Sequence, residues 1–337
     1  MINYIYQLVS PKVFSVKYEE LNFDDNVIIK PEYMAICHAD QRYYLGQRDA
    51  EILQKKLPMA LIHEACGKVV YDPSGRLKAG DTVVMIPNVP AEHEEYIYEN
   101  YAKGSKFLSS GYDGFFREYV DMPMDRIVSA QGVTERVVAI TEFISVAVHA
   151  TARMDKMAHV NRKRIGIWGD GSLAFVVANV VKKIFPQSKL IIVGKNVRKL
   201  LYFSFADETY LKDEISENFM VDHAFECCGG VGSGYAIDDI IKYINPQGTV
   251  VLMGVSEHKI AVNTRDILEK GLTFVGSSRS GKVDFEDAIE MLRDPIFRQR
   301  IEQIIYEDEE VSSIDDIHRV FQTDLNTPFK TVFHWNM

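Results

Sequence analysis

Residues 164–185 read RIGIWGDGSLAFVVANVVKKIF, and this stretch decides the fold. Its first part, Ile165–Trp168, is a short apolar run that is typical of a buried strand. From Leu173 to Phe185 the apolar residues recur at the spacing of one helix face, at positions 173, 176, 177, 180, 181 and 184. The stretch therefore predicts a strand, a glycine-rich turn and a helix, which is how a β-α-β unit begins.

The turn between strand and helix, Gly169-Asp170-Gly171, has the composition of a dinucleotide-binding site. Glycines permit a tight turn and a close approach to a pyrophosphate, and the amides of Ser172 and Leu173 at the helix start attract its charge. Ala174 replaces the third glycine of the fingerprint, which tolerates this change. A plain strand-to-helix turn is the simpler alternative, but the position between a clear strand and a clear helix favours the nucleotide site.

The end of the next strand indicates which dinucleotide binds. Leu190–Val193 is apolar and is followed by Gly194 and then by the cations Lys195 and Arg198. Enzymes that use NAD usually have an acidic residue here, which holds the ribose hydroxyls. Gly194 leaves room for a 2′-phosphate and the two cations can pair with it, so we expect NADP(H). A solvated basic helix start is the alternative.

Further strands follow at intervals that predict a parallel, doubly wound sheet in an α/β fold. We expect them at 222–227, 249–254 and 272–276. Cys227 and Gly254 lie at the ends of two of these strands, and we expect both beside the cofactor. Plain packing at the strand end is a better prediction for Cys227 and Cys228 than a redox role.

The part of the chain before residue 145 has short strands separated by irregular loops, which favours a small barrel. The expected strands are 27–31, 68–71, 82–85 and 115–120, with a buried helix at 142–154, a later helix at 285–292 and a last strand at 331–334. We expect the first of these strands to end at Pro31, because proline cannot donate to a sheet ladder.

The composition excludes several classes of protein. With 47% hydrophobic residues the chain is ordinary globular material, and its net charge of -10 argues against binding to nucleic acid or an anionic membrane. We expect no signal peptide, since no basic and apolar leader opens the sequence, and no apolar run reaches the ~18 residues of a membrane span. Four irregularly spaced cysteines do not suggest a disulfide framework. We therefore expect a cytoplasmic protein.

A candidate metal site begins at Leu61-Ile62-His63-Glu64, where an imidazole and a carboxylate stand side by side in an apolar setting. Burying such a pair is costly unless a partner such as a metal ion compensates it. Cys37 could add a sulfur ligand and Glu142 an oxygen ligand to the nitrogen of His63 and the oxygen of Glu64. Such a ligand set suits Zn²⁺. An isolated His-Glu pair is more often a half-exposed turn, and spacing alone cannot join three distant segments.

These motifs resemble those of the zinc-containing medium-chain dehydrogenases, and most of all their polyol, or sorbitol-type, branch. The resemblance covers nearly the whole chain and rests on Cys37-His38-Ala39-Asp40, Ile62-His63-Glu64, Gly80-Asp81-Thr82-Val83, Asp113 to Tyr119, Glu142 to Val146 and Glu226 to Gly229. It implies a GroES-like β-barrel catalytic domain at 1–145 and 280–337, and a Rossmann domain at 146–279. It further implies that Cys37, His63 and Glu142 bind one catalytic zinc, with Glu64 as fourth ligand or as the partner of a zinc-bound water.

The chain departs from the family pattern in five places. Residues 87–111 contain no cysteine, so the structural zinc lobe is missing. Ile62 replaces a glycine and Phe143 replaces a proline. Ala39 lacks the hydroxyl that starts the usual proton relay, and Arg42 stands where many relatives have the relay histidine.

The usual relay therefore does not carry over to this chain. We expect protons to move through water, with His38, Glu64 or Asp40 nearby, although a structural role suits Asp40 better than a catalytic one.

In these departures and in its overall sequence, the chain resembles the bacterial ribulose-5-phosphate reductases. Those enzymes make ribitol 5-phosphate for CDP-ribitol in teichoic acid or capsule synthesis. The resemblance implies reduction of a zinc-polarised ketose carbonyl by NADPH. A phosphorylated sugar needs a cationic clamp, and Arg42 is the first candidate, with an ion pair to Asp40 or Asp49 as its alternative. Further candidates are Lys106, Arg117 and Arg279.

Two other functions stay open. One is an NAD-dependent, sorbitol-type polyol dehydrogenase, and the other is a non-catalytic dinucleotide-binding protein, against which the intact Cys37, His63 and Glu142 argue. The family implies a homodimer, and the pathway implies association with a ribitol-5-phosphate cytidylyltransferase.

Overall fold

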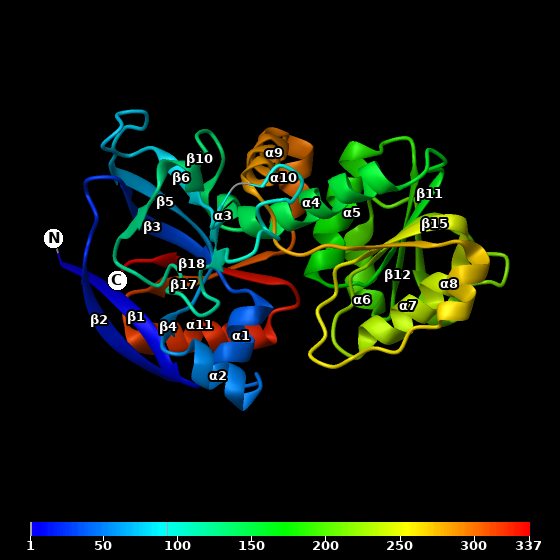
Figure 1. The fold of residues 1–337 in the computed structure, drawn as a ribbon, viewed down its shortest axis with the longest axis horizontal. Coiled ribbons are helices and arrows are strands. Elements are labelled where there is room, and N and C mark those ends of the chain that lie inside the picture. The colour runs from blue at the N-terminus through cyan, green and yellow to red at the C-terminus, as the bar shows by residue number, and fades with distance from the viewer. Residues whose placement is uncertain (1, 93) are drawn as a thin grey trace. The chain divides into compact units, whose positions relative to one another are not determined.

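The computed structural model describes residues 2–92 and 94–337, which form two compact units. Unit 1 contains Met1–Ser145 and Ser280–Met337, and unit 2 contains Val146–Arg279. Figure 1 shows that the chain builds most of unit 1, passes through unit 2 and returns to finish unit 1. No helix in the described ranges is long and apolar enough to cross a membrane.

Unit 2 contains a six-stranded parallel sheet in the order β13-β12-β11-β14-β15-β16. The strands are β11 (Arg164–Trp168), β12 (Lys189–Gly194), β13 (Glu208–Leu211), β14 (Val221–Glu226), β15 (Ile244–Leu252) and β16 (Thr273–Gly276). The helices are α5 (Ser172–Ile184), α6 (Val197–Leu200), α7 (Gly232–Tyr243) and α8 (Thr264–Lys270), and α4 (Thr141–Met157) leads into the unit. The predicted doubly wound α/β fold is therefore confirmed.

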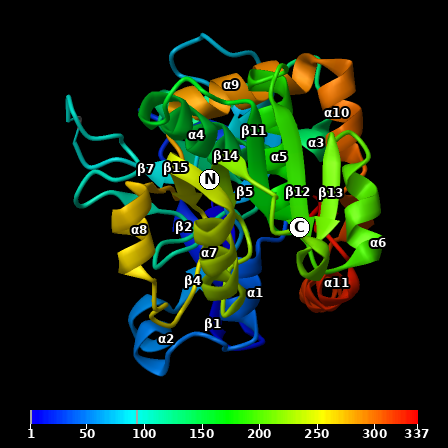
Figure 2. The ribbon, with the colours of Figure 1, turned by 90° about the vertical axis from the view of Figure 1, so that its right-hand side faces the viewer.

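Both faces of this sheet are covered because its strands are apolar on both sides. Trp168, Ala224 and Val250 pack with Ile240 of α7, and their strand neighbours point to the opposite face. Figure 1 shows α5 and α7 on opposite sides of the strands, and Figure 2 shows the parallel strands from another side. One strand, β13, was not predicted: it lies at the sheet edge, and its sequence ETYL has no continuous apolar run.

Unit 1 is built on two sheets. A small one has the order β2-β1-β4, and a larger one has the order β10-β6-β5-β3-β18-β17, with β9 also paired to β3. The strands are β1 (Ile2–Ser10), β2 (Val13–Glu20), β3 (Val27–Ala35), β4 (Met59–Ala60), β5 (Glu64–Tyr71), β6 (Thr82–Met85), β9 (Val120–Met122), β10 (Ile127–Ser129), β17 (Ile305–Val311) and β18 (Lys330–Trp335), and a separate pair consists of β7 (Asn88–Val89) and β8 (Lys106–Phe107).

The helices of unit 1 are short and lie against these sheets. They are α1 (His38–Tyr44), α2 (Ala50–Lys56), α3 (Glu135–Val138), α9 (Lys282–Arg293), α10 (Pro295–Glu302) and α11 (Ile314–Asn326). The unit's core joins the early strands to the last ones, since Ile29, Phe116, Phe321 and Trp335 belong to one buried cluster.

Two strand predictions in unit 1 were wrong. β3 does not end at Pro31 but continues to Ala35, with a register irregularity between Pro31 and Tyr33 that absorbs the missing N–H. The strand expected at 115–120 is reduced to β9 at Val120–Met122. Phe115 and Phe116 are both fully buried, so the chain does not alternate there and crosses the core as an irregular segment.

Candidate metal and dinucleotide sites

His63 and Glu64 lie where the chain enters β5, and the residue before them fixes their direction. Ile62 has a left-handed backbone with φ 71°. Its N–H donates to Asp40 Oδ1 at 3.1 Å and its carbonyl accepts from Phe115 N at 2.8 Å. Both polar groups of this strained peptide are thus satisfied, which holds the bend in place.

Cys37 and Asp40 come from the start of α1. Cys37 is the N-cap of this helix, and Asp40 Oδ2 accepts a hydrogen bond from its N–H at 3.3 Å. The buried Asp40 carboxylate also accepts from Ser109 Oγ at 2.6 Å and lies 3.5 Å from His63 Nδ1. Asp40 therefore connects the two segments that contribute Cys37 and His63, which is a structural role.

Glu142 is the second residue of α4, and it completes the cluster. The ligand atoms of His63, Glu64 and Glu142 lie within 4.8 Å of one another, and so do those of Cys37, Asp40 and His63. His63, Glu64 and Glu142 are all buried. The structure therefore brings together the residues that the sequence suggested as metal ligands.

The cluster perturbs the acidity of its members. Burial raises the pKa of Glu142 to about 7, with Glu64 adding to the effect and His63 opposing it. Burial lowers the pKa of His63, but the charges of Asp40 and Cys37 outweigh it and hold that pKa well above its usual value. Closely packed acidic groups of this kind favour binding of a cation.

One member of the site was not predicted. Lys330, at the start of β18, is buried and donates to Glu64 Oε1 at 2.6 Å and to the carbonyl of Ile36 at 2.8 Å. Its ammonium also lies 4.7 Å from the centre of the Phe143 ring. The only hint of Lys330 in the sequence was a lysine at the start of an apolar strand. No local sequence pattern pairs it with Glu64.

The donor set fits a zinc ion. Glu64 Oε2 is buried and makes no hydrogen bond within the described chain. Such atoms are costly unless another partner satisfies them, and thiolate, imidazole and carboxylate are the ligands of tetrahedral zinc. Cys37, His63 and Glu142 would hold the ion. Glu64 would face the ion with Oε2, while its Oε1 accepts from Lys330.

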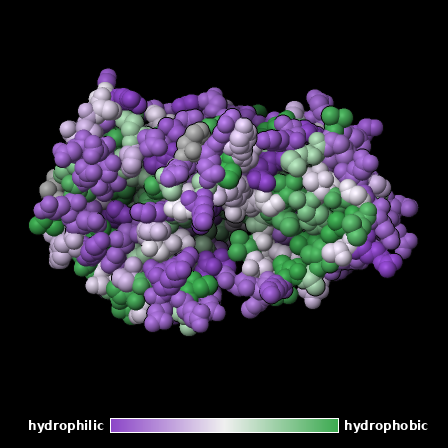
Figure 3. Space-filling model, viewed as in Figure 1, coloured by the Kyte–Doolittle hydropathy of each residue, from purple (hydrophilic) through white to green (hydrophobic). Residues whose placement is uncertain are grey.

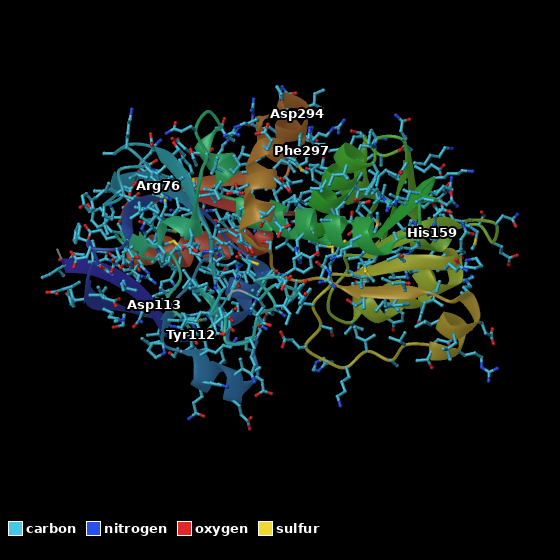
Figure 4. All side chains as sticks on the ribbon, turned by 45° about the horizontal axis from the view of Figure 1, so that its top comes forward. Arg76, Tyr112, Asp113, His159, Asp294 and Phe297 are labelled. Carbon is cyan, nitrogen blue, oxygen red and sulfur yellow. The ribbon has the colours of Figure 1, made fainter. Side chains whose placement is uncertain are left out.

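The predicted phosphate residues have different surroundings. Arg117 donates from Nε to the carbonyl of Gly114 and from Nη2 to that of Asp113, so its guanidinium cross-links a loop. Lys106 is exposed, with its ammonium 5.3 Å from the centre of the Tyr112 ring, which Figure 4 labels beside Asp113.

The surroundings of the other candidates are given by their neighbours. Phe107, the neighbour of Lys106 on β8, packs its ring against His63 with centroids 5.3 Å apart. Arg42 lies in α1 and lowers the pKa of His38 after the larger effect of burial. Arg279 belongs to unit 2.

The dinucleotide candidate lies at the carboxyl edge of the unit 2 sheet. Gly169 has φ 141°, and a Cβ there would lie 3.0 Å from the carbonyl oxygen of Cys227. Gly171 is the N-cap of α5 and gives its first amides no side-chain acceptor. A tight turn followed by an uncapped helix of 13 residues, with Ser172 and Leu173 in its first turn, fits a pyrophosphate.

The end of β12 is held by a residue from that turn. Asp170 Oδ2 accepts from the N–H groups of Lys195 and Asn196, at 2.8 and 2.7 Å. Lys195 and Arg198 are exposed, as a 2′-phosphate site requires.

Glu226 organises the loops on the other side of β11. This buried carboxylate accepts from Cys228 N at 2.8 Å, Gly229 N at 3.3 Å and Gly254 N at 2.9 Å, so it ties the ends of β14 and β15 together. A Cβ on Gly254 would lie 2.5 Å from its oxygen, which explains that glycine. Cys227 is buried beneath this edge and burial raises its pKa well above the usual range, so packing suits it better than redox chemistry.

Comparison with known proteins agrees with this arrangement. Residues 24–132 match the alcohol dehydrogenase GroES-like domain, and residues 174–294 match the zinc-binding dehydrogenase domain. Ribulose-5-phosphate reductase of Streptococcus pneumoniae is 55% identical over all of this chain and 98% of its own. The crystal structure of S. aureus TarJ in complex with NADPH is 40% identical, with a TM-score of 0.89 and full coverage of both chains. D-xylulose reductase of Saccharomyces cerevisiae is a distant relative, 26% identical over 82% of each chain.

Proposed function

We propose the activity from one premise: the chain belongs to the zinc-binding alcohol dehydrogenases, and within them to the ribulose-5-phosphate reductases. It reduces D-ribulose 5-phosphate to D-ribitol 5-phosphate with NADPH. The observation that carries this conclusion is that ligand atoms of Cys37 on one side, and of Glu64 and Glu142 on the other, lie within 4.8 Å of the buried His63 in a chain that matches such reductases over its full length. The product supplies CDP-ribitol for teichoic acid or capsule.

The residues of unit 1 have distinct parts in this reaction. When bound, zinc supplies a Lewis acid that polarises the ketose carbonyl, and NADPH supplies the hydride. Cys37, His63 and Glu142 would hold the metal, while Asp40 orients the His63 ring from its Nδ1 side. Lys330 holds one oxygen of Glu64 and leaves the other for the metal or its water.

The alcohol that forms needs a proton, and this chain has no hydroxyl at Ala39 to start a relay. His38 is exposed, and its pKa is lowered by burial of part of the ring and by Arg42. We therefore assign the proton to a water chain that His38 and Glu64 border.

The sugar phosphate binds to Arg42, with Lys106 as a second cation. Arg117 drops out of this proposal because its guanidinium is used by backbone carbonyls. Arg42→Ala should lower kcat/KM for ribulose 5-phosphate by ~100-fold, since a charged hydrogen-bond partner of phosphate is lost. Arg76→Ala is the matched control, because Arg76 is an exposed arginine in the turn after β5 (Figure 4). An equal loss with an unphosphorylated ketose would remove Arg42 from the clamp.

The function itself is tested by NADPH oxidation with ribulose 5-phosphate, compared with fructose and with NADH. We expect fast oxidation only with the phosphorylated ketose and NADPH, and one zinc per chain by mass spectrometry. Cys37→Ser should lose most of the metal and the activity together. Preference for fructose and NADH would instead support the sorbitol-type dehydrogenase, and metal-independent NADPH binding without turnover would support the non-catalytic alternative.

Association is part of the proposal. Strand β16 is an edge strand of the unit 2 sheet, and Val255 and Val262 in the segment after β15 and Leu268 in α8 are exposed. Figure 3 shows hydrophobic residues gathered around the region that Figure 1 labels α7, α8 and β15. We propose that two copies pair at this edge to form a homodimer.

The substrate and the metal ligands suggest the setting. Cys37 binds metal as a reduced thiolate, which fits the cytoplasm. A ribitol-5-phosphate cytidylyltransferase would consume the product, so we propose it as a partner.

A further inference from the structure

We propose that Asp170 is a positioning residue that sets the preference for NADPH. Its carboxylate holds the segment that contains Lys195 and Arg198, and its side chain fills the space in which an NAD-dependent enzyme would place its own acidic residue. This inference rests on the proposed use of NADPH and adds the residue that makes the 2′-phosphate site.

The first observation is a connection between two loops. Asp170 belongs to the glycine-rich turn, and its single oxygen Oδ2 accepts two hydrogen bonds from the backbone after β12, from Lys195 N and Asn196 N. Asn196 Oδ1 then accepts from Arg198 N at 3.0 Å and Lys199 N at 3.3 Å. Two side chains thus order the backbone of both cations, and the pyrophosphate turn is tied to the 2′-phosphate loop.

The second observation is the crowding above Gly194. A Cβ at this position would lie 2.8 Å from Asp170 Cβ, 3.0 Å from its Oδ2 and 2.9 Å from Leu200 Cδ2. No side chain fits there while Asp170 keeps its place. An acidic residue at 194 would also bring a second carboxylate beside that of Asp170. Repulsion between the two like charges disfavours this arrangement.

The two observations have one consequence for specificity. NAD-dependent enzymes direct a carboxylate at the ribose hydroxyls from the end of the second strand. Here the carboxylate beside that strand end is directed at backbone N–H groups, and the exposed side chains that follow are cationic. The loop therefore presents positive charge to the ribose, which suits a 2′-phosphate.

The experiment measures the Kd of NADPH and of NADH by fluorescence titration of the zinc-loaded enzyme. Asp170→Ala should weaken NADPH by at least ~10-fold and NADH by less than ~3-fold, because two backbone hydrogen bonds are lost and the cations are displaced. Asp170→Asn should bind NADPH within ~3-fold of the wild type, since one amide oxygen can accept both bonds. The thermal midpoint of each variant without cofactor, compared with that of the wild type, shows whether the variant is folded.

A double-mutant cycle separates positioning from direct contact. If Asp170 acts through the cation, Asp170→Ala combined with Lys195→Ala weakens NADPH much less than the sum of the two single effects. Full additivity, an equal loss for both cofactors, or a loss in Asp170→Asn as large as in Asp170→Ala would each overturn the proposal.

Gly194→Ala keeps the test open if Asp170→Ala does not fold. Its methyl group pushes against Asp170, so it should weaken NADPH more than NADH, and no such difference would contradict the inference. Failure of the wild type to bind NADPH would refute the proposed function, whereas tight wild-type binding with insensitive variants refutes only the role of Asp170.

Discussion

Ile62 shows how a single residue is strained to present its neighbour. It is β-branched and fully buried, yet its φ of 71° is in the region that glycine prefers. The isoleucine packs in the core of unit 1, and this burial offsets the strain.

We predict that Ile62→Gly lowers the free energy of unfolding by about 2 kcal/mol. Relief of the left-handed strain returns about 1–2 kcal/mol, but loss of a buried isoleucine costs about 2–5 kcal/mol. Urea unfolding of the metal-free protein measures the difference. Ile5→Gly, at a buried strand position, should cost more by the amount of the strain, and a stabilised Ile62→Gly would show that strain dominates.

Lys330 gives a second prediction at this scale. Lys330→Met leaves the Glu64 carboxylate buried without its cation, which should destabilise the metal-free protein by about 3 kcal/mol. Bound zinc compensates the same charge, so the rise in thermal midpoint on adding zinc should be larger in the variant than in the wild type. Lys330→Arg, which keeps the charge, is the control, and an identical zinc-induced rise in all three proteins would separate Lys330 from the metal site.

Among the elements, β14 contains a histidine that is buried in its neutral form. His223 Nδ1 accepts from Thr249 N at 3.1 Å, and Nε2 lies 3.1 Å from the carbonyl of Asn161, to which it can donate. Burial, and then the charge of the neighbouring His159, lower its pKa from 6.5 to about 4. Figure 4 labels His159 in unit 2.

This pKa predicts how stability changes with acid. The unfolded chain takes up the proton near pH 6.5 and the folded one only near pH 4, so the contribution of neutral His223 is full above pH 6.5 and is lost as the pH falls from 6.5 to 4. His223→Gln can keep both hydrogen bonds without titrating. Thermal unfolding across this range should therefore show a smaller loss of stability in the variant, and parallel curves would contradict the assignment.

The same scale shows what could be predicted from sequence. α4, α5 and the apolar strands of unit 2 were found because their periodicity is local and strong. The strand expected at 115–120 was wrong because Phe115 and Phe116 are both buried by contacts with residues far away in the chain. The candidate ligands Cys37, His63 and Glu142 came from a family resemblance, and no local pattern places Lys330 beside Glu64 or Asp170 beside Lys195, since these contacts exist only in the folded chain.

At the scale of the whole molecule, we expect each ligand to stabilise the unit that contains its site. Removal of zinc by a chelator should increase hydrogen exchange in α1 and β5 and leave β11 and β12 protected, because the ligand residues belong to unit 1. NADPH at 100 times its Kd should add about 2.7 kcal/mol to the stability of the protein that binds it. Exchange that rises equally in both units after chelation would show that the two do not unfold separately.

The return of the chain to unit 1 has a consequence for biosynthesis. On the ribosome, residues 146–279 emerge before residues 280–337, so unit 2 can fold while unit 1 still lacks β17, β18 and α11. β18 pairs with β3 and brings Lys330, so the cation of the metal cluster is translated after the whole of unit 2. A nascent chain halted before β18 would contain Cys37, His63 and Glu64 without this partner, and the metal cluster reaches its final form only after β18 has been translated.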